Sequence, residues 1–207
     1  MQNNKGNSII EVMVVIVIIT TGLVGTYGIL NSGQRLATDS TNRIKAINLA
    51  REGLEAVENI RDTNWIKFSS DYINCWKVKD YDATCIGNPG KEFSAGSYNL
   101  YQSGSLWYLS GTITPSMVDY NTYRDQFAIY VDSGGLSATT GNNTVLCSQT
   151  HTTYCRSIYA REIKLSHPDA NHFKIDSIVS WKDNGSKVSA PYTITLETIL
   201  TNWKNNF

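Results

Sequence analysis

The chain has 207 residues, with 18 basic and 18 acidic side chains, and therefore carries no formal net charge. Charged residues make up 17% of it, below the roughly 25% typical of soluble proteins, and no basic block indicates nucleic-acid binding. The length suffices for one or two domains with a hydrophobic core, and an aromatic content of 11% argues against disorder.

The shortage of charge is concentrated near the amino terminus. Glu11 and Arg35 enclose 23 consecutive uncharged residues, most of them apolar up to Leu30. A helix needs about 20 such residues to cross a membrane. A secretory signal peptide has an apolar region of only about 7–15 residues, and no clear small-x-small cleavage site follows this run. We therefore predict a transmembrane helix over residues 7–30.

Glu11 lies near the start of this apolar segment. A carboxylate in a membrane helix costs about 2.5–3.5 kcal/mol at the bilayer centre and less near its edge. In the simplest interpretation, a lipid headgroup or water satisfies Glu11. The preceding residues favour another interpretation, because the short polar stretch MQNNKG contains one Lys, ends at Gly6 and places Glu11 five residues further on.

With these features the amino terminus resembles the type IV pilin and pseudopilin family. The resemblance rests on Lys5-Gly6 as the end of a leader, Glu11 as the fifth mature residue, and the apolar run that follows. It implies cleavage after Gly6 by a prepilin peptidase and N-methylation of Asn7, which stands where the family usually has Phe. It also implies that Glu11 meets the amino terminus of a neighbouring subunit. Such a charge pair would penalise wrong helix registers, since they leave charges unpaired.

Three glycines, Gly22, Gly25 and Gly28, recur every three residues in the second half of the apolar run. Small residues allow close packing between helices in membranes. Each glycine also weakens a helix by about 1 kcal/mol relative to alanine. In assembled filaments of the resembled family, this part of the helix can extend. Both interpretations stay open.

The helical pattern continues over residues 31–64. No Pro interrupts residues 7–64, and the mixed charges of this stretch are typical of a solvent-exposed face. Its apolar residues recur at helical spacing on one face, namely Ile44, Ile47, Ala50, Leu54, Val57 and Ile60. We predict one long helix whose second, amphipathic half packs on a globular head. Residues 49–65 also resemble that second half in pilin-like proteins.

The remainder of the chain, residues 65–207, reads as a β-rich head. Its short alternating runs predict strands at 97–101, 106–109, 126–131, 159–165, 174–181 and 189–198. Asp183-Asn184-Gly185 predicts a hairpin turn, and residues 196–203 fit either a strand end or a short helix. The expected fold is α+β, with an antiparallel sheet laid on the long helix. Its predicted divisions are a leader (1–6), a transmembrane or filament-core helix (7–30), an amphipathic continuation (31–64) and the head (65–207).

The head contains four cysteines, Cys75, Cys85, Cys147 and Cys155. No CxxC motif occurs, which argues against a structural zinc site. An even number of cysteines in a domain predicted to lie outside the membrane indicates disulfides. Of the three possible pairings we favour Cys75–Cys85 with Cys147–Cys155, because each would close one short loop. Four buried thiols are the alternative.

Motifs for catalysis or cofactor binding are not apparent. His167, Asp169 and His172 are interpreted as a polar loop between strands rather than as metal ligands. Residues 132–135 and 141–144 carry oxygen-bearing side chains without EF-hand spacing. The sequence contains no phosphate-binding loop and no GxSxG motif. We expect no catalytic residues, no metal, no cofactor, no small-molecule substrate and no nucleic-acid partner.

The leading functional prediction is a structural subunit, a minor pilin or pseudopilin. Its precursor would span the cytoplasmic membrane once with the C-terminus outside, and the mature chain would join other pilin subunits in an extracellular filament. Alternatives are an adhesive binding module at a pilus tip, a component of a type II secretion pseudopilus, and a membrane-anchored hydrolase. The sequence does not distinguish a pilus from a secretion pseudopilus or a DNA-uptake filament.

Overall fold

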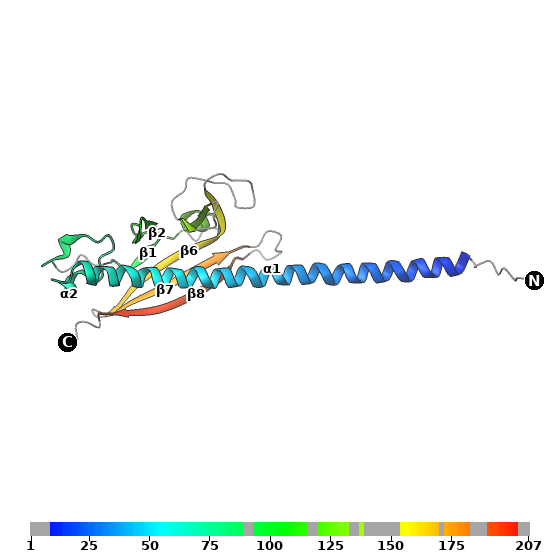
Figure 1. The fold of residues 1–207 in the computed structure, drawn as a ribbon, viewed down its shortest axis with the longest axis horizontal. Coiled ribbons are helices and arrows are strands. Elements are labelled where there is room, and N and C mark those ends of the chain that lie inside the picture. The colour runs from blue at the N-terminus through cyan, green and yellow to red at the C-terminus, as the bar shows by residue number, and fades with distance from the viewer. Residues whose placement is uncertain are drawn as a thin grey trace, which may run out of the picture. The chain divides into compact units, whose positions relative to one another are not determined.

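The structure is a computed structural model that describes residues 9–88, 93–115, 120–132, 137–138, 154–169, 172–182 and 190–202. The chain divides into two compact units, Met1–Ile44 and Lys45–Phe207. A single helix, α1 (Ile9–Lys67), contributes residues to both units (Figure 1). This confirms the long helix predicted from the sequence. α1 ends in a turn in which the Phe68 amide donates to the Asn64 carbonyl at 2.9 Å and the Asp71 amide donates to the Phe68 carbonyl at 3.0 Å.

The second unit is built on an antiparallel sheet with the strand order β5-β4-β6-β7-β8, and β1 also pairs with β6. Strands β2 and β3 form a separate two-stranded ribbon. The strands are β1 (Gly96–Tyr98), β2 (Leu100–Ser103), β3 (Leu106–Leu109), β4 (Ala128–Asp132), β5 (Ser137–Ala138), β6 (Tyr154–Asp169), β7 (His172–Trp181) and β8 (Tyr192–Thr201); the short helices are α2 (Tyr72–Cys75), α3 (Tyr120–Gln126) and the 3-10 turn η1 (Ala83–Cys85). The α+β fold class is thus confirmed.

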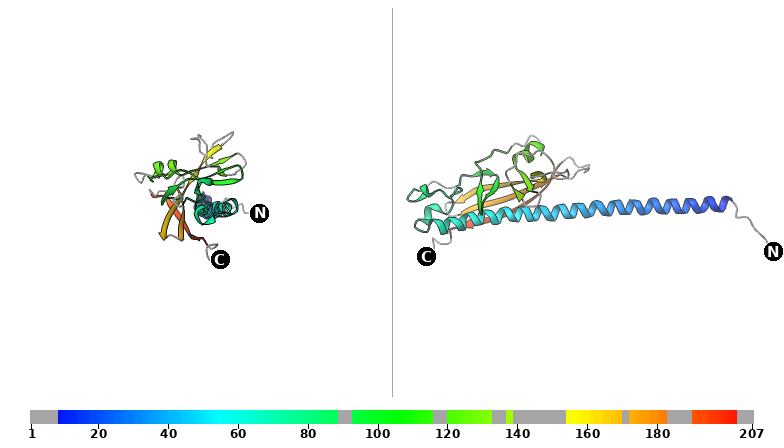
Figure 2. Two further views of the ribbon diagram at one scale, coloured as in Figure 1. Left: turned by 90° about the vertical axis from the view of Figure 1, so that its left-hand side faces the viewer. Right: turned by 45° about the horizontal axis from the view of Figure 1, so that its top comes forward.

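The sheet is covered on both faces at β6. Alternate residues of β7 (Ile175, Val179 and Trp181 among them) are buried in clusters shared with the part of α1 that belongs to this unit (Figure 2). On the opposite face, Tyr123 and Phe127 pack with Ala160 of β6. Burial on both faces explains why β6 does not alternate strictly between apolar and polar residues.

The face of α1 that contacts the sheet agrees only in part with the predicted one, because Ala50, Val57 and Ile60 are buried as expected. Ile44, predicted to face inward, is 60% exposed. The buried residues of α1 are Ala46, Ala50, Gly53, Ala56, Val57, Ile60, Asn64 and Trp65. The reason is close approach: a Cβ at Gly53 would lie 2.9 Å from Ile163 Cδ1 and would also collide with Ser177 Oγ. Small residues mark this contact, because larger ones would force the helix away from the sheet.

Several element boundaries also differ from the predictions. The strand predicted at 97–101 is two strands with different partners, β1 and β2, separated at Asn99. Helix α3 was not predicted, and the expected strand at 126–131 begins only at Ala128. Residues 196–201 continue β8, which settles the choice between strand and helix there. The predicted turn at Asp183-Asn184-Gly185 lies outside the described residues.

A disulfide joins Cys75 at the end of α2 to Cys85 in η1, with the α-carbons 5.3 Å apart. This is the first of the two pairings favoured from the sequence. Asp71 braces the same loop, because its carboxylate accepts hydrogen bonds from the Gly87 amide at 2.7 Å and from the Asn74 amide at 3.3 Å. Hydrogen bonds from Gly87 and the Asn74 side chain lower the pKa of Asp71. Cys147 and the side chain of Cys155 lie outside the described residues, so the second pairing stays a prediction.

Candidate functional site

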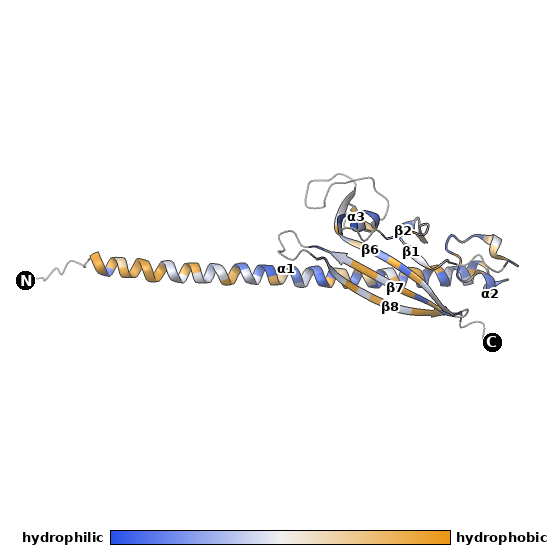
Figure 3. Ribbon diagram, turned by 180° about the vertical axis from the view of Figure 1, so that it is seen from behind, coloured by the Kyte–Doolittle hydropathy of each residue, from blue (hydrophilic) through white to orange (hydrophobic). Residues whose placement is uncertain are grey.

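The first candidate site is the apolar part of α1, residues 9–30. Its large hydrophobic side chains are all exposed, from 48% at Val15 to 79% at Ile9. Figure 3 shows the hydrophobic colour concentrated on these turns of the helix. The helix is long and apolar enough to cross a membrane. A continuous apolar surface of this extent marks a region that lipid or another protein covers.

The polar side chains of this segment are largely satisfied inside the helix. Thr20, Thr21 and Thr26 each donate their hydroxyl to the carbonyl four residues earlier, at 2.8, 2.9 and 2.7 Å. Threonine commonly makes this bond in helices. In lipid, where no water is available, it removes the cost of an unpaired hydroxyl.

Glu11 is the exception in this segment. It lies in the first turn of the described helix, where a negative charge interacts favourably with the helix dipole. Its carboxylate forms no ion pair with any residue that the structure describes. Gly6 and Asn7, the predicted cleavage and methylation positions, lie outside the described residues. The predicted pairing of Glu11 with a neighbouring subunit therefore remains a hypothesis about assembly.

The glycines of the apolar segment have no steric role within the described subunit. A Cβ at Gly22, Gly25 or Gly28 would meet nothing within 4 Å, in contrast to Gly53. The fold of one chain therefore does not require these glycines. Both earlier interpretations, close packing against another helix and a locally weak helix, are compatible with this observation.

A buried ion pair ties the second unit together. The Arg161 guanidinium on β6 is 2% exposed and lies 3.1 Å from the Glu52 carboxylate on α1. The same nitrogen donates to the Leu49 carbonyl at 3.3 Å. Burial lowers the pKa of Arg161, and the Glu52 charge opposes that shift. Glu52 was predicted to belong to a solvated face, which is wrong because the sheet brings Arg161 against it.

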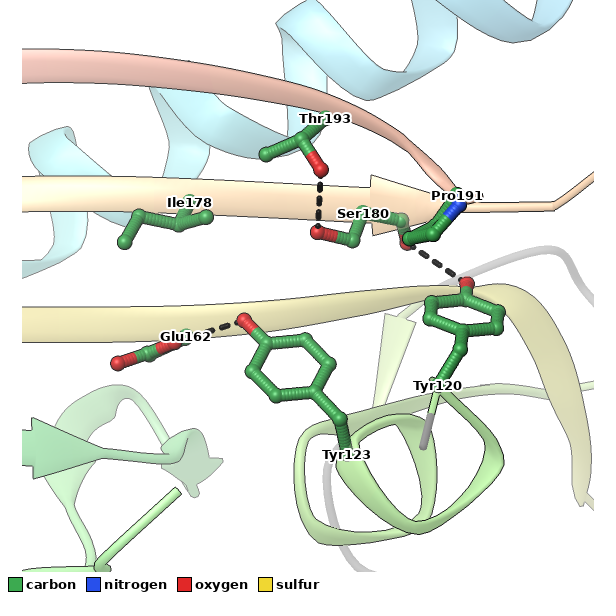
Figure 4. Close-up of a pocket in the computed structure, with 7 residues that line it drawn as sticks. All are labelled: Tyr120, Tyr123, Glu162, Ile178, Ser180, Pro191 and Thr193. Carbon is green, nitrogen blue, oxygen red and sulfur yellow. Dashed lines mark hydrogen bonds between the residues drawn. The ribbon is translucent and has the colours of Figure 1, made fainter. Parts of the chain in front are cut away.

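The second candidate site is a cavity of about 330 Å³ on the sheet face opposite the one that packs on α1 (Figure 4). Its described lining residues are Tyr120, Tyr123, Glu162, Ile178, Ser180, Pro191 and Thr193. Glu162 is 4% exposed, and its two oxygens accept hydrogen bonds from the hydroxyls of Ser97 and Tyr123. Burial, and next the hydrogen bond to Glu162, raise the pKa of Tyr123.

Sequence reasoning did not find this cavity. Its residues come from α3, β6, β7 and the start of β8, which are distant in the chain. The sequence did contain one indication of it. Arg161 and Glu162 are adjacent in a predicted strand, and adjacent side chains of a strand point to opposite faces of the sheet. Each of these two charged side chains therefore needs a polar partner on its own face of the sheet.

The predicted polar loop around residues 167–172 is described only in part. His172 begins β7, and the side chains of His167 and Asp169 lie outside the described residues. In the described segments, no three His, Cys, Asp or Glu side chains gather in a way that could hold a metal ion.

Residues 1–27 match the family model described as the prokaryotic N-terminal methylation motif. They carry the type IV prepilin leader signature. The prepilin segment predicted from the short polar leader, Gly6, Glu11 and the apolar run is thereby confirmed, and it supports a type IV pilin-like or pseudopilin precursor. The apolar helix fits a membrane-anchored precursor, and the type IV pilin family is structural. No curated protein and no solved structure matches the chain.

Proposed function

We propose that the chain is a minor pilin or pseudopilin, a structural subunit of a type IV pilus-like filament. It is held in the cytoplasmic membrane as a precursor, cleaved after Gly6 by a prepilin peptidase, and assembled with other pilin subunits through its N-terminal helix. The prepilin signature on residues 1–27 carries this proposal. The exposed apolar side chains of residues 9–30 support it.

The apolar helix surface explains how one segment serves both stages. Burying a Val, Leu, Ile or Met side chain fully is worth about 1.5–3 kcal/mol, whether lipid or protein covers it. In the bilayer the acyl chains cover residues 7–30, and in the filament the same residues of adjacent subunits cover one another. The charged Glu11 then pairs with the amino terminus of a neighbour, so that one register is favoured over the others.

The proposed assembly also assigns a role to the two remaining parts of the chain. Residues 31–64 continue the helix onto the head, and residues 65–207 form the head outside the cytoplasmic membrane. The Cys75–Cys85 disulfide supports an oxidising location for that part of the chain. The neutral net charge gives no sign of a nucleic-acid partner.

Sequencing the amino terminus of the protein purified from its own cells tests the proposal. We expect a mature chain that begins at Asn7. Gly6→Leu should leave the uncut precursor in the membrane and exclude it from filaments, because the leader then stays attached. Gly111→Leu is the matched control, since a Cβ at Gly111 meets nothing within 4 Å. A mature chain that begins elsewhere would refute the assignment.

An adhesive role at the filament tip is a second candidate function, and the cavity lined by Tyr120 and Glu162 is the observation that favours it. A tip subunit should appear only at filament ends when labelled with an antibody against the head. Labelling along the whole filament would instead identify the chain as a subunit of the shaft.

A further inference from the structure

We infer that the cavity on the sheet face opposite α1 is a binding site for a small organic cation, an ammonium group that carries short alkyl substituents. The cavity has about 330 Å³, at the lower end of the roughly 300–1,000 Å³ of ligand pockets. A site of this size admits a compact ligand or a single side chain. The inference goes beyond the filament role and does not depend on it.

The aromatic wall of the cavity is held in place. Tyr120 and Tyr123 lie three residues apart on α3, which puts both rings on the same side of that helix (Figure 4). The Tyr123 hydroxyl donates to Glu162 at 2.7 Å, and the Tyr120 hydroxyl lies 3.2 Å from the Ser180 carbonyl and 3.3 Å from that of Ile158. Fixed rings need little ordering when a ligand binds, and the face of a tyrosine ring attracts cations.

Glu162 sets the sign of the ligand charge. It is the charged residue among the described lining residues, and both of its oxygens accept hydrogen bonds from neutral hydroxyls. No cation of the described chain pairs with it, because the adjacent Arg161 points to the other face and binds Glu52. A buried carboxylate without a counter-charge is costly. A carboxylate has about four acceptor positions, so Glu162 retains capacity for a ligand N–H or a close cation.

The other lining residues indicate which chemical groups the ligand carries next to its ammonium centre. Ile178 and Pro191 offer apolar surface for methyl or methylene groups. The hydroxyls of Ser180 and Thr193 lie 3.1 Å apart, and their mutual hydrogen bond uses only one of their two protons. The Ser180 side chain also hydrogen-bonds with Tyr123, so these hydroxyls offer a ligand their oxygens as acceptors. A methylated or alkyl ammonium group with a nearby hydroxyl, which donates to one of these oxygens, fits this lining.

The full-length protein in non-ionic detergent can be titrated with choline chloride at constant ionic strength and followed by calorimetry. We expect saturable binding at least tenfold tighter than that of 3,3-dimethyl-1-butanol, the neutral isostere. Nα-acetyl-lysine amide forms a second arm. Tighter binding of choline would support a free small ammonium compound as the ligand, and tighter binding of the lysine derivative would support a lysine side chain of another protein.

Two variants test the assignment of residues. Glu162→Gln should weaken choline binding at least tenfold, while Glu197→Gln, which changes an exposed carboxylate on β8, should leave it unchanged. Thr193→Lys places an ammonium at the exposed rim and should abolish choline binding without lowering the thermal midpoint. This variant keeps the test decisive if Glu162→Gln fails to fold.

Equal affinity for choline and its neutral isostere, full binding by Thr193→Lys, or the absence of saturable choline binding by the wild-type chain would each overturn the inference. None of these measurements requires leader cleavage or filaments. Failure here would therefore leave the proposed filament role intact, and failure of processing would leave the binding site intact.

Discussion

At the scale of single residues, the Glu52–Arg161 pair carries the clearest energetic consequence. Glu52→Ala should destabilise the protein by about 2–3 kcal/mol, because it leaves the buried guanidinium without its carboxylate. Removing one member of a fully buried pair costs about 3–5 kcal/mol. The expected loss is smaller here because Glu52 is one-third exposed. Urea unfolding measures this change. The double variant Glu52→Ala with Arg161→Met should recover most of the loss, whereas additive losses would contradict a direct pair.

Tyr81 predicts a pH dependence at the alkaline end. Its hydroxyl donates to the Trp107 carbonyl at 2.7 Å, its ring meets Tyr108 edge-on, and burial raises its pKa to about 12. The folded state therefore holds this proton more tightly than the unfolded state, whose tyrosine pKa is about 10. The resulting stability is complete below pH 10 and is lost as the pH rises towards 12.

Comparing wild type with Tyr81→Phe isolates this contribution from the other groups that titrate in the same range. The variant should be less stable at pH 9, because it lacks the hydrogen bond, and should lose less stability between pH 10 and 12. Urea unfolding at fixed pH values measures both. An equal loss of stability by the two proteins over that range would exclude Tyr81 as the titrating group.

Predictions at the residue scale succeeded where the chemistry is local. The prepilin signature lies within one short stretch, and Cys75 and Cys85 are ten residues apart. Arg161 and Glu162 could not be assigned partners from the sequence, because those partners lie on elements far along the chain. Only the folded sheet brings Glu52 to one face and Tyr123 to the other.

At the scale of elements, the contact between α1 and the sheet depends on small residues. Gly53→Ala should cost about 1–3 kcal/mol, in the range of overpacked cores, although alanine favours the helix by about 1 kcal/mol. The added methyl would meet Ile163 and Ser177, which are paired with each other on the adjacent strands β6 and β7. Urea unfolding of the detergent-solubilised protein, followed by near-UV circular dichroism, measures the effect on the head.

Gly25→Ala is the matched control, because its Cβ meets nothing within 4 Å. It should leave unfolding of the head unchanged. If both substitutions lower the stability of the head equally, the close approach at Gly53 is not the cause. If neither does, the helix shifts at negligible cost, which would contradict the tight contact.

The buried residues of α1 show why the existence of this helix was easier to predict than the exact residues that it buries. An uninterrupted pattern without Pro is sufficient to predict α1, and helical spacing correctly placed Ala50, Val57 and Ile60 on its buried side. Ile44 is exposed, while Ala46 and Gly53, which were not predicted to face inward, are buried, since steric fit as well as hydrophobicity decides a close contact. Helix α3 was missed because its seven residues are too few to establish a period.

At the scale of the whole molecule, the main prediction concerns assembly. Glu11→Ala should still be cleaved after Gly6 but should enter filaments poorly, because no charge pair then distinguishes the correct helix register. Quantifying mature protein in sheared filament and membrane fractions measures this. Glu55→Ala, an exposed carboxylate further along α1, should behave as wild type. Normal incorporation of the Glu11 variant would remove the register argument.

The threonines of the apolar segment have a consequence for reversibility. Because Thr20, Thr21 and Thr26 already donate within their own helix, exchanging lipid for protein surroundings breaks none of these hydrogen bonds. Under the proposed assembly, these hydroxyls therefore add no hydrogen-bonding cost to the transfer of the helix in either direction. In that assembly, Glu11 is then the polar group of this segment whose surroundings change between the bilayer and the filament.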